Sequence, residues 1–220
     1  NESPIFNDGG MGYWWNIAED TPVGTIVGTV SAPDPQGDTV NFALTSGSET
    51  FAIDSATGEI TLIAALDYES SQYASFGVQA TDTDGNSSTS WGDITVQDVN
   101  ESPVFTDGGM GYWWSTAEDT PAGTVVGIVA ATDPQGDEVT YELTSGTGTF
   151  SINSTTGEIT LITALDYETN QYASFGVRAT DTNGNSSTSW GDISIVDVNE
   201  SPVFTDGGMG YWWSVPEDTA

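Results

Sequence analysis

The hexapeptide Asp98-Val99-Asn100-Glu101-Ser102-Pro103 recurs 99 residues later as Asp197-Val198-Asn199-Glu200-Ser201-Pro202. The chain opens on the end of the same phrase, Asn1-Glu2-Ser3-Pro4. A fixed period of about one small domain is typical of a tandem array. The sequence therefore predicts two complete repeats, residues 1–99 and 100–198, and the N-terminal strand of a third repeat in residues 199–220.

Within each repeat, short runs rich in Val, Ile, Thr and aromatic residues alternate with polar ones, as β-strands do. Turn signals of Pro, Gly, Asn and Asp separate these runs, and no stretch keeps a helical period over three turns. The strands predicted in the first repeat are Tyr13–Ile17, Thr25–Val30, Val40–Leu44, Thr50–Ile53, Glu59–Ile63, Ala74–Ala80 and Ser90–Val96. Seven short strands in about 100 residues predict an all-β chain of tandem seven-stranded Greek-key, immunoglobulin-like sandwiches arranged end to end.

The composition excludes several classes of function. There are 33 acidic residues and one basic residue, Arg178, for a formal net charge of −32. Binding to nucleic acid or to an anionic membrane surface is therefore excluded. The chain has no Cys and no His, so disulfides, zinc sites of thiolate or imidazole and histidine-based triads are excluded too. No apolar run approaches the roughly 20 residues of a membrane span, so no membrane insertion is expected.

The acidic residues sit in short phrases that keep one order in both repeats. Each repeat carries Glu-Asp-Thr, Asp-Pro-Gln-Gly-Asp, Leu-Asp-Tyr-Glu and Ala-Thr-Asp before the linker hexapeptide. Oxygen ligands that recur at repeat junctions favour a hard cation, Ca²⁺, which takes six to eight oxygens. The alternative is that these acids cap turns and keep the loops soluble.

These phrases resemble the cadherin repeat, in its bacterial cadherin-like form, over both complete copies. The matching motifs are Ala18-Glu19-Asp20-Thr21-Pro22, Ala65-Leu66-Asp67-Tyr68-Glu69, Asp98-Val99-Asn100-Glu101, Ala131-Thr132-Asp133-Pro134-Gln135 and Ala179-Thr180-Asp181. The resemblance implies two to three Ca²⁺ ions at each junction, held by both neighbouring repeats and by the linker between them.

The resemblance also implies which residues hold the ions. At the first junction they are Glu19, Asp67 and Glu69, the linker residues Asp98, Val99, Asn100, Glu101 and Ser102, and then Asp133, Gln135 and Asp181. At the junctions nearer the chain ends they are Asp34, Gln36 and Asp82, and then Glu118, Asp166, Glu168, Asp197, Asn199, Glu200 and Glu217. Gln36 and Gln135 replace an Asp that is usual in the family, which should weaken one ion unless Asp38 or Asp137 compensates. Glu101 stands where Asp is commoner.

A second phrase, Gly-Gly-Met-Gly-Tyr-Trp-Trp, occurs three times and belongs to no cadherin motif. It holds the consecutive tryptophans Trp14 and Trp15, Trp113 and Trp114, and Trp212 and Trp213. Neighbouring residues on a strand point to opposite faces, so one ring of each pair is expected in the core and the other outside. The outer ring has three alternative roles: packing against its own repeat, a lateral contact between subunits, or a platform for glycans. Trp91 and Trp190 lie mid-strand and are expected in the core.

Together these features predict an extracellular or cell-surface module, a Ca²⁺-rigidified spacer of a repetitive adhesin or surface filament. Weak modular Ca²⁺ sites suit millimolar extracellular Ca²⁺. The expected partners are neighbouring copies of the same repeat, in a head-to-tail fibre or in lateral filament contacts. The alternative is a carbohydrate-binding module that uses the exposed Trp-Trp phrase. An enzyme is not expected, because the two-residue spacing and duplication of Asp67 and Glu69 favour ligation over a glycosidase pair.

Overall fold

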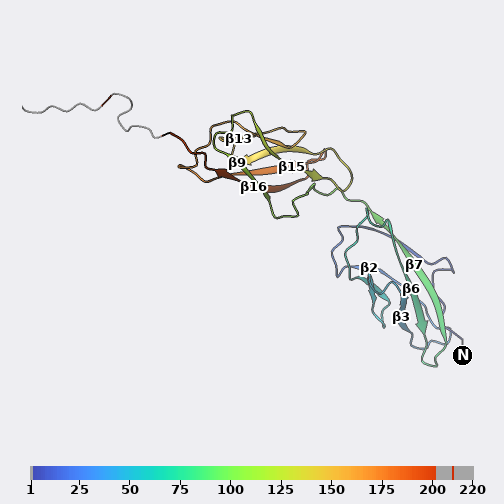
Figure 1. The fold of residues 1–220 in the computed structure, drawn as a ribbon. Coiled ribbons are helices and arrows are strands. Elements are labelled where there is room, and N and C mark those ends of the chain that lie inside the picture. Colours follow the sequence, from blue (N-terminus) through green and yellow to red (C-terminus); the bar gives the residue numbers. More distant parts are fainter. Residues whose placement is uncertain (1, 202–209, 211–220) are drawn as a thin grey trace, which may run out of the picture. The chain divides into compact units, whose positions relative to one another are not determined.

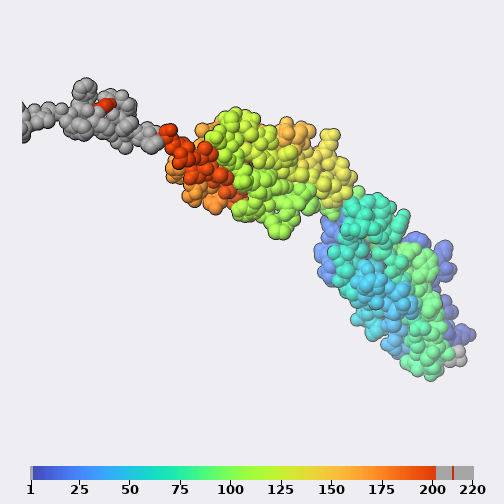
Figure 2. All heavy atoms as spheres, in the orientation of Figure 1, coloured from blue at the N-terminus to red at the C-terminus, as the bar shows by residue number. Residues whose placement is uncertain are grey.

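The computed structural model describes residues 2–201 and Gly210. By its internal contacts the chain divides into two compact units. Of the described residues, the first unit holds 2–101 together with 134–136, and the second holds 102–133 and 137–201. Each unit is closely packed (Figure 2). The described residues contain no helix, and so none that is long and apolar enough to cross a membrane.

The first unit has seven strands (Figure 1). They are β1 (Tyr13–Ala18), β2 (Ile26–Thr29), β3 (Asn41–Ser46), β4 (Phe51–Ile53), β5 (Glu59–Leu62), β6 (Tyr73–Thr81) and β7 (Ser87–Gln97). One sheet has the order β1-β7-β6-β3 and the other β2-β5-β4. All pairs are antiparallel except β1 with β7, which run parallel from Tyr13 opposite Gly92 to Ala18 opposite Gln97.

The second unit repeats this arrangement. Its strands are β8 (Val104–Phe105), β9 (Tyr112–Ala117), β10 (Val125–Ile128), β11 (Ala131–Thr132), β12 (Thr140–Ser145), β13 (Phe150–Ile152), β14 (Glu158–Leu161), β15 (Tyr172–Thr180) and β16 (Ser186–Val196). The sheets are β12-β15-β16-β9 and β10-β14-β13, with a short extra ladder between β8 and β11. The predicted seven-stranded immunoglobulin-like sandwich is therefore confirmed, and the predicted strands of the first repeat differ from the observed ones only by a few terminal residues.

The core lies between the two sheets because alternate residues of each strand point inward. Ile60, Phe76 and Ile94, from three different strands, are almost fully buried. A tight turn leads into β5, and Gly58 occupies it with φ +73°. A Cβ at Gly58 would lie 2.4 Å from the Val30 carbonyl oxygen, so only glycine fits there.

The Trp-Trp phrase divides between the two faces of the sheet as predicted. The ring of Trp15 stacks on Phe76 with centroids 5.7 Å apart. Trp14 points outward and is 62% exposed. In the second unit Trp114 stacks on Phe175 and Trp113 points outward, while Trp212 and Trp213 lie outside the described residues.

Candidate metal centres

Three carboxylates meet at the end of the first unit where β1 and β7 both terminate. Glu19 directly follows β1, and Asp98 directly follows β7. Because these strands are parallel neighbours, with Ala18 opposite Gln97, the two acids leave the sheet side by side. Glu69 joins them from the loop between β5 and β6, and one oxygen of each residue lies within 4.8 Å of the others. This set, Glu19, Glu69 and Asp98, is called the linker cluster below.

Glu19 is the structural centre of the linker cluster. Only 6% of its surface is exposed, and its two carboxylate oxygens accept backbone N–H groups from different segments. Oε2 accepts from Tyr68 at 2.6 Å, and Oε1 accepts from Val99 at 2.7 Å. The bonds to Glu19 therefore position both the loop that carries Glu69 and the start of the linker.

The second unit has the same cluster with one member more: Glu118, Glu168, Asp197 and Glu200. Tyr167 and Val198 donate their backbone N–H groups to Glu118 at 2.7 Å each, and these bonds lower the pKa of its carboxyl group. In contrast, the pKa of Glu200 is raised. The main cause is partial loss of hydration, and repulsion from Glu118 and Glu168 adds to it. Crowded carboxylates of this kind favour a cation that would neutralise them.

A different cluster lies at the opposite end of the first unit and consists of Asp34, Asp38 and Asp82. It is called the distal cluster below. Asp34 Oδ1 accepts N–H groups from Gln36 at 2.8 Å and Asp38 at 3.2 Å. Asp34 is only 9% exposed, and its Oδ2 atom is buried without a hydrogen-bond partner. A buried carboxylate oxygen with no donor is costly, and a cation would satisfy it.

Asp82 enters the distal cluster from the end of β6 and is 4% exposed. Burial acts to raise its pKa, but hydrogen bonds from the side chain and backbone of Asn86 and from Asp84 N–H outweigh burial and lower it. The carboxyl group is thereby held in its charged form, which is the form that binds a metal ion.

The corresponding loops of the second unit carry Asp133, Asp137 and Asp181. The backbone N–H of Asp137 donates to Asp133 Oδ1 at 3.2 Å, as Asp38 does to Asp34. The Asp137 carboxylate, however, accepts a hydrogen bond from Asn183 Nδ2 at 3.1 Å. Asn183 replaces Asp84 of the first repeat, so this amide partner of Asp137 has no counterpart in the first unit.

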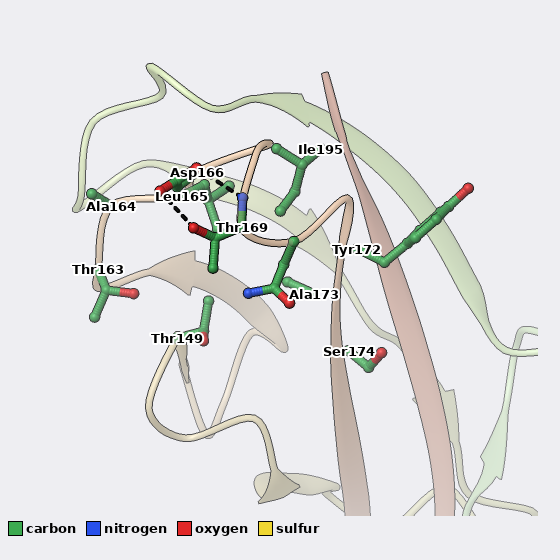
Figure 3. A pocket seen from close by; sticks show the side chains of 11 residues that line it. Thr149, Thr163, Ala164, Leu165, Asp166, Thr169, Tyr172, Ala173, Ser174 and Ile195 are labelled. Atoms are coloured by element: carbon green, nitrogen blue, oxygen red, sulfur yellow. Dashed lines mark hydrogen bonds between the residues drawn. The ribbon is translucent and has the colours of Figure 1, made fainter. Parts of the chain in front are cut away.

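Not every predicted ligand joins a cluster. Asp67 accepts hydrogen bonds from the backbone and hydroxyl of Ser70 at 3.1 and 2.7 Å. Asp166 accepts the same two bonds from Thr169 (Figure 3). Neither belongs to the groups of mutually close carboxylates among the described residues, although Asp166 lines a hollow of about 690 Å³ with Glu118, Glu168 and Glu200.

Gln36 and Gln135 also have structural partners. Gln36 Oε1 accepts the backbone N–H of Glu2 at 3.0 Å. Gln135, which belongs to the first unit by its contacts, accepts the N–H of Glu101 at 3.1 Å and donates to Glu101 Oε2 at 2.6 Å. Asn100 Nδ2 donates to the Glu101 carbonyl, and Glu217 lies outside the described residues.

From the sequence Asp38 is expected only to compensate for Gln36, whereas in the structure it belongs to the distal cluster. The signal was the Asp-Pro-Gln-Gly-Asp turn, which returns the chain so that its first and last residues are close. The expectation that Trp91 and Trp190 are core residues is wrong. They are 41% and 43% exposed, because the inward positions of β7 fall on Gly92, Ile94 and Val96.

The chain is a tandem array of immunoglobulin-like sandwiches with acidic clusters at their ends. Comparison with known proteins gives its family. The cadherin domain family matches residues 13–97 and 112–196. Human protocadherin Fat 1 is 32% identical over 212 residues, which are 88% of this chain and 5% of that protein. The Drosophila melanogaster protocadherin-like wing polarity protein stan is 35% identical over 217 residues, 92% of this chain and 6% of that protein. The chain belongs to the cadherin family.

Solved structures agree with this assignment. Repeats EC1-2 of human protocadherin-24 (form II) superpose with a TM-score of 0.62 at 25% identity, over 90% of this chain and 100% of that one. Repeats EC22-24 of mouse cadherin-23 give 0.56 at 25% identity, over 90% and 68%. Cadherin domains are typically calcium-dependent adhesion modules of extracellular proteins. The chain spans only a small part of its full-length relatives, 5% and 6% of the two named above.

Proposed function

We propose that the acidic ends of these repeats bind Ca²⁺ and that the chain is a Ca²⁺-stiffened spacer of an extracellular adhesin or surface filament. The observation that carries this proposal is the separation of 4.8 Å or less between carboxylate oxygens in each cluster. A Ca²⁺ ion holds its oxygens at about 2.3–2.6 Å, so two ligands of one ion lie at most about 5 Å apart. The clusters therefore already have the spacing that one shared ion requires.

In this proposal the linker cluster converts ion binding into stiffness. Glu19 holds the backbone of Val99, and Asp98 stands immediately before it in the linker. When Ca²⁺ bridges Glu69 and Asp98, the start of the linker is fixed to its own repeat. Without the ion, repulsion among these carboxylates opposes that arrangement.

The distal cluster contributes a second set of ligands, Asp34, Asp38 and Asp82. Gln36 is engaged with the linker backbone through Glu2, so Asp38 supplies the third carboxylate beside Asp34 and Asp82. The unpartnered Oδ2 atom of Asp34 supports an ion here. We therefore assign Asp38 a role as a Ca²⁺ ligand, and Gln36 a role in holding the linker.

The remaining assignments follow from the family resemblance. We propose that Asp133, Asp181 and the carbonyl oxygens of linker residues complete the coordination of ions started by the linker cluster, with two to three ions at each junction. Asp67 would join only after releasing its bonds from Ser70. Because the relatives belong to an adhesion family, we propose an extracellular location and a non-enzymatic role in contacts between repeat-bearing chains.

Two measurements test the proposal on the full 220-residue chain. The first is isothermal titration of the EDTA-treated protein with Ca²⁺, comparing wild type with Glu69→Gln. The second is small-angle scattering in millimolar Ca²⁺ and in excess EDTA. Glu49→Gln is the matched control, because Glu49 is exposed and belongs to none of the clusters.

We expect Ca²⁺ to produce the profile of a stiff rod and EDTA that of flexing units. Glu69→Gln should lower both the number of bound ions and the stiffening, and Glu49→Gln should change neither. The proposal would be contradicted by a scattering profile in EDTA identical to that in Ca²⁺, or by an unchanged number of bound Ca²⁺ ions in Glu69→Gln. These acids would then only cap turns and keep the loops soluble.

A further inference from the structure

An exposed pair of tryptophans lies on the outer face of the larger sheet in each unit, away from the acidic clusters. Trp14 of β1 and Trp91 of β7 meet edge to face, with ring centroids 5.2 Å apart at 81°. Trp113 and Trp190 repeat this contact at 5.2 Å and 83°. We call these the outer tryptophan pairs. Trp14 is 62% exposed and Trp113 is 61% exposed.

The loop before β1 contacts the first pair, and the loop before β9 contacts the second. Trp14 Nε1 donates to the carbonyl of Met11 at 3.1 Å, and Gly12 packs directly on the ring of Trp91. A Cβ at Gly12 would lie 2.8 Å from that ring. Trp113 bonds to Met110 at 3.3 Å, and Gly111 lies under Trp190 in the same way. A preorganised aromatic surface loses little conformational entropy when a ligand binds it.

The outer rings are not needed to fill the core, because Trp15 already covers the inner side of β1 by stacking on Phe76. Beside Trp190 the surface is hollowed by about 440 Å³, within the usual range of small-ligand sites. The hollow is lined by Pro103, Val104, Asp107, Gly108, Thr188 and Trp190, together with neighbouring residues. Aromatic and apolar walls with a few hydroxyl and carboxylate groups are typical of a site for a small polar molecule that has an apolar face.

Charge disfavours two kinds of occupant. A net charge of −32 with Arg178 as the one basic residue disfavours any anionic ligand. A second copy of this chain would place equal negative charge against this face, where Asp93 is the residue opposite Trp14 in the strand register. A neutral ligand meets no such repulsion. Thr89 and Asp93 flank Trp91 on the outward side of β7 and offer a hydroxyl and a carboxylate for hydrogen bonds.

We propose that each outer tryptophan pair binds a neutral saccharide, whose apolar C–H face packs on the indole rings while its hydroxyls bond to polar groups on the same face. This function goes beyond Ca²⁺-dependent stiffening. The pairs recur every 99 residues, so each complete repeat carries one such site.

The test is a titration of the ¹⁵N-labelled chain, with indole Nε1–H signals followed by NMR in excess EDTA and again in Ca²⁺. The probes are the neutral hexasaccharides of β-1,4-glucan, β-1,3-glucan, β-1,4-mannan, β-1,4-xylan, β-1,4-galactan and α-1,4-glucan. The test variant is the double substitution Trp14→Ala and Trp113→Ala. The matched control is Tyr73→Ala and Tyr172→Ala, which removes two exposed aromatic rings from the same sheets but outside the pairs.

We expect at least one probe to shift the signals of Trp14, Trp91, Trp113 and Trp190 saturably and to leave those of Trp15 and Trp114 in place. The Trp variant should bind roughly tenfold or more weakly, and the Tyr control should bind like wild type. Failure of every probe to shift the outer indoles would overturn the proposal, as would equal binding by the Trp variant. Self-association that disappears in the Trp variant, with no saccharide binding, would make this face a protein interface instead.

Discussion

The Glu19 carboxylate accepts a hydrogen bond from the backbone N–H of Val99 at 2.7 Å, 80 residues further along the chain. This bond attaches the linker to the end of the repeat without the help of a metal ion. Glu118 and Val198 form the same bond in the second unit, also at 2.7 Å. An acidic residue that family resemblance assigns to Ca²⁺ therefore has a structural role in the protein alone.

Substitution of Glu19 should therefore weaken the protein even without Ca²⁺. Glu19→Ala leaves the N–H groups of Tyr68 and Val99 without their acceptor and should lower the free energy of unfolding by about 2 kcal/mol. Urea denaturation of the EDTA-treated protein measures this loss, with Glu49→Ala as the control. Equal stability of Glu19→Ala and wild type in EDTA would show that Glu19 acts only through a bound ion.

Calcium should raise thermal stability by linkage. At a free Ca²⁺ concentration one hundred times the dissociation constant, each ion adds about 2.7 kcal/mol to the free energy of unfolding. For a domain of about 100 residues this corresponds to a rise in Tm of roughly 10–20 °C. Differential scanning calorimetry in EDTA and in Ca²⁺ measures the shift, and Mg²⁺ at equal concentration provides the comparison. A Tm that does not depend on Ca²⁺ would contradict the proposed sites.

Asp38 should matter for Ca²⁺ although the family resemblance does not assign it a role. Asp38→Asn removes one charge from the distal cluster while preserving size and the backbone bond to Asp34. We expect the affinity of one ion to fall by roughly tenfold with little change in stability in EDTA, which isothermal titration and urea denaturation measure together. The control is Glu49→Gln. A titration curve identical to wild type would remove Asp38 from the ligand set.

Acid should destabilise the Ca²⁺-free protein. The hydrogen bond from Ser90 lowers the pKa of Asp8. Burial acts to raise the pKa of Asp107, but bonds from Ser189 and the backbone of Gly109 and Gly111 outweigh burial and lower it. A carboxyl group whose pKa is lower in the folded state stabilises the fold above its unfolded pKa, and this stability is lost as pH falls through the folded pKa. Stability should therefore decline below about pH 4.

Glu200 contributes with the opposite sign, because its raised pKa means that stability falls as pH rises through the interval above its ordinary value. Urea denaturation between pH 3 and pH 7 in EDTA measures both trends. The double variant Asp8→Asn and Asp107→Asn should flatten the acid branch, and a wild-type pH profile in that variant would contradict the prediction.

The two adjacent tryptophans should differ sharply in their effect on folding. Trp15→Ala removes a ring that stacks on Phe76 and should cost about 3 kcal/mol. Trp14→Ala removes a largely exposed ring and should cost less than about 1 kcal/mol. Urea denaturation of both variants measures the difference. Equal losses would mean that the outer ring is a structural element rather than a free surface.

Much of the fold was predictable because its signals are local. The alternation of apolar residues predicted the strands of the first repeat, and the opposite faces of Trp14 and Trp15 follow from strand geometry alone. The misassignment of Trp91 has a local cause as well. The small residue Gly92 occupies an inward position against the ring of Phe76, so hydrophobicity alone pointed to the wrong face of β7.

The sequence by itself determined the repeat, the seven strands and the positions of the acids along the chain, since each depends on residues close to one another. Only the tertiary structure decided which acids meet. Glu19 and Asp98 lie together because β1 and β7 run parallel, whereas Asp67 is held by Ser70 and Asp38 joins Asp34 through a turn. The convergence of carboxylates depends on how distant strands pair and where loops return, and these are properties of the folded chain rather than of any one segment.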